Sequence, residues 1–128
     1  MKKVGEVMAR SLLTLAEDAT LTAAATEMTS RSVGSALVVD GDRLVGIITE
    51  RDVLRAVGAG SVDGKVGDWM TRHPETVDAD ESTQQAGVVM IHGGFRHLPV
   101  LDGGRPVGIV SIRDLMRVVL EDVSPRGV

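Results

Sequence analysis

The sequence contains the same pattern twice, at a constant offset of 62 residues. The heptapeptide GIITERD at 46–52 recurs as GIVSIRD at 108–114. Without any gap, the same offset pairs VGEVM at 4–8 with VGDWM at 66–70. Chance matches do not keep one register over so long a stretch, so the chain is a tandem duplication of one structural unit. We place the first repeat at 1–60 and the second at 61–128, which together form one module.

The order of elements predicted for the first repeat is β-α-β-β-α. After a short helix at 4–9 and an extended piece at 13–15, apolar residues at helical spacing predict an amphipathic helix over 20–31. Two strands follow, joined by an Asp-Gly turn, and a second helix ends the repeat. Their ranges are 33–39 and 44–48 for the strands and 50–57 for the helix.

The second repeat has the same order, with a helix at 82–92, strands at 96–101 and 106–110, and a helix at 112–121. The glycine-rich segment 58–64 between the repeats predicts a flexible linker. About 60 residues bury too little apolar surface to be stable alone. We therefore expect a mixed α/β (α+β) fold whose two repeats pack through their sheets with pseudo-twofold symmetry.

Composition excludes several classes of function. A net charge of −4 and 2% aromatic residues argue against nucleic-acid binding, which needs basic surface and stacking side chains. No apolar run reaches the length of a membrane span, and the chain has no cysteine. We expect a cytoplasmic protein.

The sequence also contains no residue pattern that indicates a catalytic site or a metal site. The histidines at 73, 92 and 97 do not share a helix face, so we expect no metal site. No nucleophile has a histidine in the same motif, so we expect a binding module and not an enzyme.

The repeated heptapeptide carries two interpretations. Thr49 with Asp52, and Ser111 with Asp114, have the spacing of a capping box, in which hydroxyl and carboxylate satisfy the free N–H groups of a helix start. A strand that leads into a helix also exposes N–H groups suited to an anion, with an acidic acceptor nearby for a sugar diol. Both interpretations fit the residues.

Taken together, the two repeats resemble a tandem pair of cystathionine-beta-synthase (CBS) domains. The resemblance covers 4 to about 119 and rests on the paired Gly-apolar-apolar-(Thr/Ser)-x-x-Asp strings, the two VGxxM segments and FRHLPVLD at 95–102. It implies a regulatory module that binds AMP, ADP, ATP or S-adenosylmethionine, with or without Mg²⁺, in clefts between the repeats. It also implies a homodimer and an effector protein that senses the ligand. The alternative is a structural or interaction module whose clefts are vestigial.

The resemblance further implies roles for particular residues. Asp52 and Asp114 would hold the ribose hydroxyls, and Thr49 and Ser111 would contact ribose or phosphate. The adenine would be walled by one isoleucine from each repeat, Ile47 and Ile109. Apart from the resemblance, Arg51 and Arg113 lie at the second helical position, where a cation opposes the helix dipole, and they are either solvated surface residues or phosphate contacts.

Each cleft would also use the opposite repeat. The Asp52 cleft would receive Arg96 and His97, and the Asp114 cleft Gly34 and Ser35. Because Arg96 is a fixed cation, we expect the Asp52 cleft to prefer the more highly phosphorylated ligand and to bind it more tightly.

Overall fold

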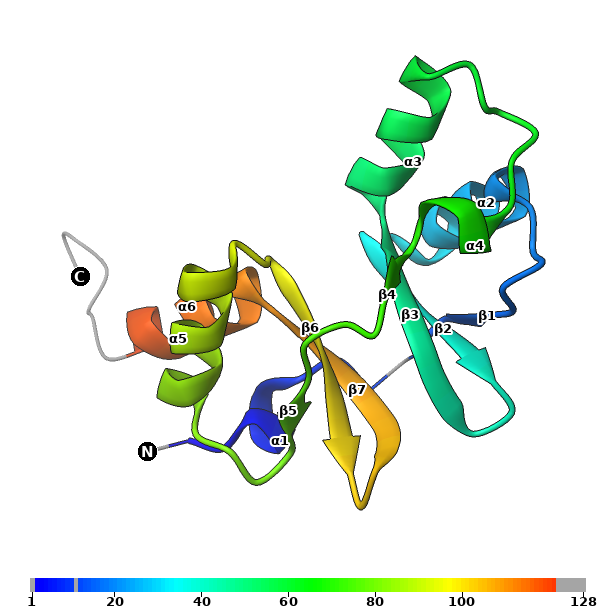
Figure 1. Cartoon of the computed structure of the whole chain (residues 1–128). Coiled ribbons are helices and arrows are strands. Elements are labelled where there is room, and N and C mark those ends of the chain that lie inside the picture. Colours follow the sequence, from blue (N-terminus) through cyan, green and yellow to red (C-terminus); the bar gives the residue numbers. More distant parts are fainter. Residues whose placement is uncertain (1, 11, 122–128) are drawn as a thin grey trace, which may run out of the picture. The chain divides into compact units, whose positions relative to one another are not determined.

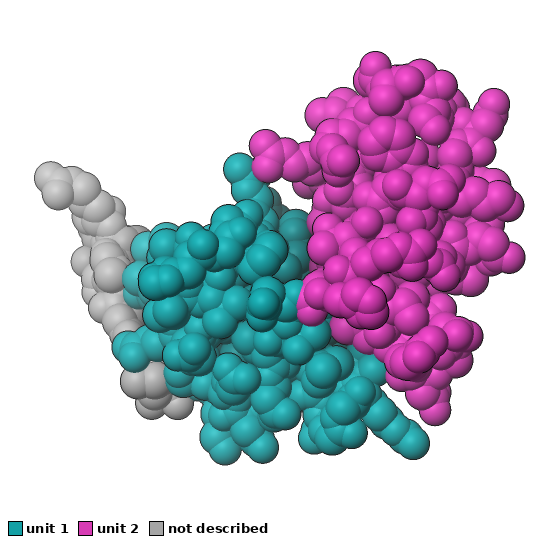
Figure 2. Space-filling view, in the orientation of Figure 1, with its two compact units in different colours: residues 1–11, 75–128 teal, residues 12–74 magenta. Residues whose placement is uncertain are grey.

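The computed structural model describes residues 2–10 and 12–121, which form two compact units (Figures 1 and 2). One unit consists of 12–74, and the other combines 75–128 with the first eleven residues. We call them the Asp52 unit and the Asp114 unit. Both contain strands and helices in the β-α-β-β-α order, which confirms the mixed α/β fold.

The Asp52 unit is a four-stranded sheet with strand order β1-β2-β3-β4. Strand β1 (Thr14–Leu15) runs parallel to β2 (Ser35–Asp40), which forms a hairpin with β3 (Arg43–Thr49). The short β4 (Thr71–Arg72) pairs with β3 on the other side. Its helices are α2 (Leu21–Arg31), α3 (Glu50–Gly58) and α4 (Val66–Trp69).

The Asp114 unit repeats this plan with strand order β5-β6-β7. Its strands are β5 (Val77–Asp78), β6 (His97–Asp102) and β7 (Arg105–Ser111), and its helices are α1 (Val4–Val7), α5 (Thr83–Gly93) and α6 (Ile112–Glu121). Where the Asp52 unit has β4, this unit has a single bridge between Ala9 and Ile109.

Local signals in the sequence explain where these elements begin and turn. The hydroxyls of Thr20 and Ser82 cap α2 and α5 by accepting the N–H groups of Ala23 and Gln85, each at 3.0 Å. Gly41 takes a left-handed conformation, φ 63°, in the hairpin turn between β2 and β3. The elements observed therefore lie within about two residues of the ranges predicted.

Each unit has its own apolar core on the helix-covered face of its sheet. In the Asp52 unit, residues of α2, β2, β3, α3 and α4 contribute, among them Met28, Val38, Ile48, Ala56 and Met70. The core of the Asp114 unit is built in the same way, with Met90, Val100, Val110, Leu115 and Met8. Aliphatic and methionine side chains thus fill both cores, as the low aromatic content predicts.

The compact units do not coincide with the sequence repeats 1–60 and 61–128, because the VGxxM segments are exchanged. Gly5 donates its N–H to the carbonyl of Ala79 at 2.9 Å, so α1 lies on the second repeat. Gly67 donates to the carbonyl of Glu17 at 2.9 Å, so α4 lies on the first. Each repeat is completed by the short helix that the sequence alignment assigns to the other.

A glycine in the central strand makes room for each exchanged segment. A Cβ built on Gly46 would lie 2.6 Å from Met70 Sδ and 2.8 Å from the Thr71 carbonyl oxygen. Gly108 has the same relation to Met8 and to the Ala9 carbonyl, also 2.8 Å away. Close approach of backbone and methionine therefore requires glycine at this position in both repeats.

The segment 58–64, whose glycine content predicts a flexible linker, begins with the last residue of α3 and continues as turns. Ser61 donates its N–H to the Ala56 carbonyl at 2.9 Å, and Gly64 accepts from Leu21 at 3.0 Å. Gly60, with φ 78°, supplies the left-handed residue. Gly60 thus allows the backbone conformation that this turn requires.

Candidate nucleotide-binding site

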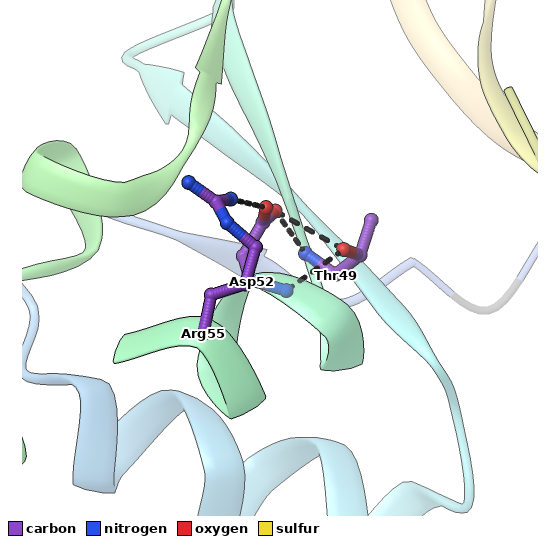
Figure 3. A network of polar contacts seen from close by, with 3 residues as sticks. All are labelled: Thr49, Asp52 and Arg55. Carbon is purple, nitrogen blue, oxygen red and sulfur yellow. Dashed lines mark hydrogen bonds and ion pairs between the residues drawn. The ribbon is translucent and has the colours of Figure 1, made fainter. Parts of the chain in front are cut away.

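The functional candidates of the Asp52 unit gather where β3 leads into α3. Thr49 is the N-cap residue and forms a complete capping box with Asp52 (Figure 3). The Thr49 N–H donates to Asp52 Oδ2 at 2.9 Å, and the Asp52 N–H donates to Thr49 Oγ1 at 3.3 Å. The Thr49 hydroxyl also donates to Oδ2, at 3.1 Å. The capping-box interpretation is therefore confirmed for Thr49 and Asp52.

A second residue, Arg55, also holds the Asp52 carboxylate. Arg55, one turn further along α3, donates from Nη1 to Asp52 Oδ1 at 2.8 Å (Figure 3). The Asp52 side chain is 11% exposed, whereas Arg55 is 58% exposed. A nearly buried carboxylate is thus kept in one orientation by donors on both of its oxygens.

The Asp114 unit has the equivalent arrangement where β7 leads into α6. The Ser111 N–H donates to Asp114 Oδ2 at 2.8 Å, and the Asp114 N–H donates to Ser111 Oγ at 3.1 Å. Arg117 approaches Asp114 Oδ1, but only to 3.5 Å. The Asp114 side chain is 14% exposed. The duplication therefore preserves two carboxylates in the same local geometry.

The start of each helix is less free to bind an anion than the sequence predicts. The first N–H of α3, that of Glu50, donates to the Gly34 carbonyl at 3.0 Å, and the third donates to Thr49. In α6 the N–H of Ile112 donates in the same way to the Arg96 carbonyl at 2.9 Å. Neighbouring strand ends thus satisfy part of the N-terminal N–H set.

The four residues assigned to opposite clefts lie at the strand–helix junction of their own unit. Ser35 pairs with Thr49 across the sheet and is buried, and His97 pairs with Ser111 and is half-buried. That Arg96 and His97 serve the Asp52 cleft, and Gly34 and Ser35 the Asp114 cleft, stays a prediction. The pseudo-twofold packing of the repeats stays a prediction as well.

The remaining candidates occupy two kinds of environment. Ile47 and Ile109 are both buried. Side chains alternate along β3 and β7, and the next residues, Ile48 and Val110, belong to the helix-covered cores, so the two isoleucines lie on the opposite face of their sheets. Arg51 and Arg113, in the first turns of α3 and α6, are exposed. Contact of these four residues with a ligand stays a prediction.

The residues that sequence reasoning missed are Arg55 and Trp69. The Arg55 guanidinium lies 5.5 Å from the centre of the Trp69 ring, within the range of a cation–π contact. Trp69 is half-buried and packs against the core of the Asp52 unit. A signal was present, since Arg55 and Arg117 also recur at the 62-residue offset.

Two global features complete the description. The part of the chain that the structure describes contains no helix long and apolar enough to cross a membrane. Within those same residues, no three His, Asp or Glu side chains are grouped as a metal ion would require.

The sequence matches the CBS domain family twice, over residues 4–59 and 66–121. The chain belongs to the CBS domain family. Among curated relatives of this CBS pair, an uncharacterized 17.7 kDa protein of Acidianus ambivalens is 38% identical over 93% of the chain and 74% of its own length. The chain spans only 43% and 61% of the next two relatives.

Solved structures resemble the CBS pair over nearly its whole length. A protein with CBS domains from Burkholderia ambifaria MC40-6 has a TM-score of 0.91 at 32% identity, covering 99% of this chain and 100% of its own. The CBS pair of protein MJ0100, solved with 5-methylthioadenosine and S-adenosyl-L-methionine, has a TM-score of 0.88 at 26% identity, with coverages of 93% and 96%. CBSX2, solved with AMP, has a TM-score of 0.83 at 26% identity, with coverages of 94% and 98%.

Proposed function

We propose that this CBS pair is a regulatory module that binds an adenosine-containing ligand through Asp52 and Asp114. The ligand is AMP, ADP, ATP or S-adenosylmethionine. The observation that carries the proposal is the pair of equivalent carboxylates, 11% and 14% exposed, each held at a strand–helix junction. The relatives solved with AMP and with S-adenosyl-L-methionine support the same class of ligand.

Each carboxylate accepts hydrogen bonds from the two hydroxyls of a ribose. A carboxylate offers about four acceptor positions, and hydrogen bonds to a charged acceptor are about twice as strong as neutral ones. Thr49 and Ser111 lie next to these oxygens, and each hydroxyl can rotate toward a ligand. Arg51 and Arg113 supply exposed positive charge near the phosphate.

Regulation follows from differential binding. A ligand that prefers one arrangement of the module stabilises that arrangement, and an effector protein reads it. Exposed apolar side chains on α5 and α6 support the homodimer that the family resemblance implies. They are Val88, Ile91, Ile112, Met116, Val119 and Leu120.

A second candidate function is favoured by the complete capping boxes. With Thr49 and Ser111 already paired to their aspartates, both carboxylates have a purely structural use in the free protein. The chain would then be an interaction module that binds no nucleotide.

Calorimetric titration separates these functions. Wild type, Asp52→Ala and Asp114→Ala are titrated with AMP, ADP, ATP and S-adenosylmethionine, with and without Mg²⁺. Arg43→Ala is the control, because Arg43 is an exposed cation at a hairpin turn of the same unit. We expect binding by wild type and Arg43→Ala that weakens in the aspartate variants.

The results that overturn the proposal are equally definite. If wild type binds no ligand of this panel, the chain is the interaction module. Incubation of the protein with ATP and Mg²⁺ tests the regulatory assignment separately, since ADP formation would reveal an enzyme.

A further inference from the structure

The two carboxylates differ in how firmly their outer oxygen is held. Arg55 Nη1 lies 2.8 Å from Asp52 Oδ1, a short charge-assisted hydrogen bond. Arg117 Nη1 lies 3.5 Å from Asp114 Oδ1, at the limit of a hydrogen bond. Both inner oxygens accept a backbone N–H, from Thr49 at 2.9 Å and from Ser111 at 2.8 Å, and Asp52 Oδ2 also accepts the Thr49 hydroxyl at 3.1 Å. On the outer oxygen, the difference between the two sites is the distance to the arginine.

The Trp69 ring explains why Arg55 is better placed. Trp69 ends α4, which contacts α3, and its ring lies 5.5 Å from the Arg55 guanidinium carbon. In the other unit α1 contacts α6 in the same way, and the position equivalent to Trp69 is Val7. Valine cannot hold a guanidinium by a cation–π contact. Only the Asp52 unit has an aromatic ring behind its arginine at this position.

The contact between Arg55 and Asp52 determines how many acceptor positions each Asp52 oxygen has left for a ligand. Oδ2 of Asp52 accepts the Thr49 N–H and the rotatable Thr49 hydroxyl, and Oδ1 accepts Arg55. If the hydroxyl turns toward a ligand, one position is left on each oxygen. Each oxygen then has one fixed N–H donor and one free position, as a vicinal diol with two hydroxyl donors requires.

We propose that Arg55, supported by the Trp69 ring, is a positioning residue that orients the Asp52 carboxylate for a ribose diol and makes this site the more selective one. The inference rests on the proposed function. It adds that selectivity for ribose over deoxyribose depends on Arg55 and Trp69, two residues outside the repeated heptapeptide.

The test compares AMP with 2′-deoxy-AMP and 3′-deoxy-AMP. Wild type, Arg55→Ala, Arg55→Lys and Trp69→Val are titrated with each nucleotide by calorimetry, with Arg43→Ala as the matched control. Trp69→Val installs the residue that the other repeat carries at the equivalent position, Val7. Because Trp69 is the one tryptophan of the chain, its fluorescence reports the Asp52 site separately in all variants that keep it.

We expect Arg55→Ala to lower the preference for AMP over either deoxynucleotide about three- to tenfold, since one partner of the ion pair is exposed. Trp69→Val lowers it about two- to fivefold, as expected for an exposed cation–π contact. Arg55→Lys restores part of the loss, because lysine keeps the charge but not the planar fork. Arg43→Ala leaves the preference unchanged.

An unchanged ribose preference in Arg55→Ala overturns the inference, whatever happens to overall affinity or to the melting temperature. A purely structural role for Arg55 would lower the affinity for all three nucleotides equally. If wild type binds none of them, the proposed function itself fails. The two failures are therefore distinguishable.

Discussion

Gly46→Ala tests whether the VGxxM segment at 66–70 and β4 pack on β3 of the Asp52 unit as the structure describes. The new Cβ would lie 2.6 Å from Met70 Sδ and 2.8 Å from the Thr71 carbonyl oxygen, whereas carbon contacts are optimal at about 3.5–4.0 Å. The methionine side chain can move, but the carbonyl belongs to β4, which pairs with β3 through Gly46 and Ile47. Relief therefore requires a backbone shift of β4.

The magnitude follows from two opposing terms. Overpacking in a well-packed core costs about 1–3 kcal/mol, and replacing glycine by alanine returns about 0.4–1 kcal/mol by restricting the unfolded chain. We expect the free energy of unfolding to fall by about 1–2 kcal/mol. For a chain of this size the melting temperature falls by about 3–10 °C.

Urea denaturation, followed by circular dichroism and by Trp69 fluorescence, measures this change. Gly58→Ala is the matched control, because Gly58 lies in α3 and a Cβ there would meet nothing within 4 Å. We expect this control to be as stable as wild type or slightly more stable. If Gly46→Ala unfolds at the same urea concentration as wild type, Met70 and β4 do not pack on Gly46 as described.

Three further predictions concern other parts of the chain. Asp52→Ala removes one half of a capping box, so it should lower the free energy of unfolding by about 1–2 kcal/mol in urea titrations without ligand; equal stability would show that the box is not formed. Gly87→Ala adds a methyl group to α5 at 3.8 Å from Leu115 Cδ1, an ordinary contact, and should raise the melting temperature by a few degrees, in contrast to the loss expected at Gly46. Leu120→Glu places a charge on the exposed apolar face of α6, where the leucine is 56% exposed, and should shift the mass measured by light scattering from dimer to monomer. A monomeric wild type would contradict the proposed homodimer.

The elements could be predicted from sequence because their signals are local. The Asp-Gly turn at 40–41 and the hydroxyl caps at Thr20 and Ser82 act on residues within three positions, and the structure contains all of them. The capping box of Thr49 and Asp52 is local in the same sense. The duplication then confirms each signal by showing it twice.

The exchange of the VGxxM segments could not be predicted in this way. A four-residue helix has no preference of its own for one of two similar surfaces, and the alignment groups residues 4–8 with the repeat that follows them directly. The contacts of Gly5 and Gly67 with loops of the other repeat determine on which repeat each short helix packs. Such contacts lie far apart in the chain, so periodicity does not reveal them.

The Arg55–Trp69 contact was missed for a different reason. Trp69 stands where the other repeat has Val7, but this difference in the sequence does not by itself identify the partner of the ring. The ring in fact packs against the core on one side and contacts Arg55. Its partner lies in α3, and only the docking of α4 on α3 brings the two together.

The two interpretations of the heptapeptide predict different dependences of stability on ligand concentration. As a capping residue, Asp52 contributes about 1–2 kcal/mol whether or not nucleotide is present. As a ligand residue, it contributes an increment that grows with ligand concentration and reaches about 2.7 kcal/mol at one hundred times the dissociation constant. Thermal unfolding of wild type and Asp52→Ala over a series of AMP concentrations therefore separates them. A constant difference indicates a cap alone, whereas a difference that widens with AMP shows that the residue which caps α3 in the free protein also holds the nucleotide.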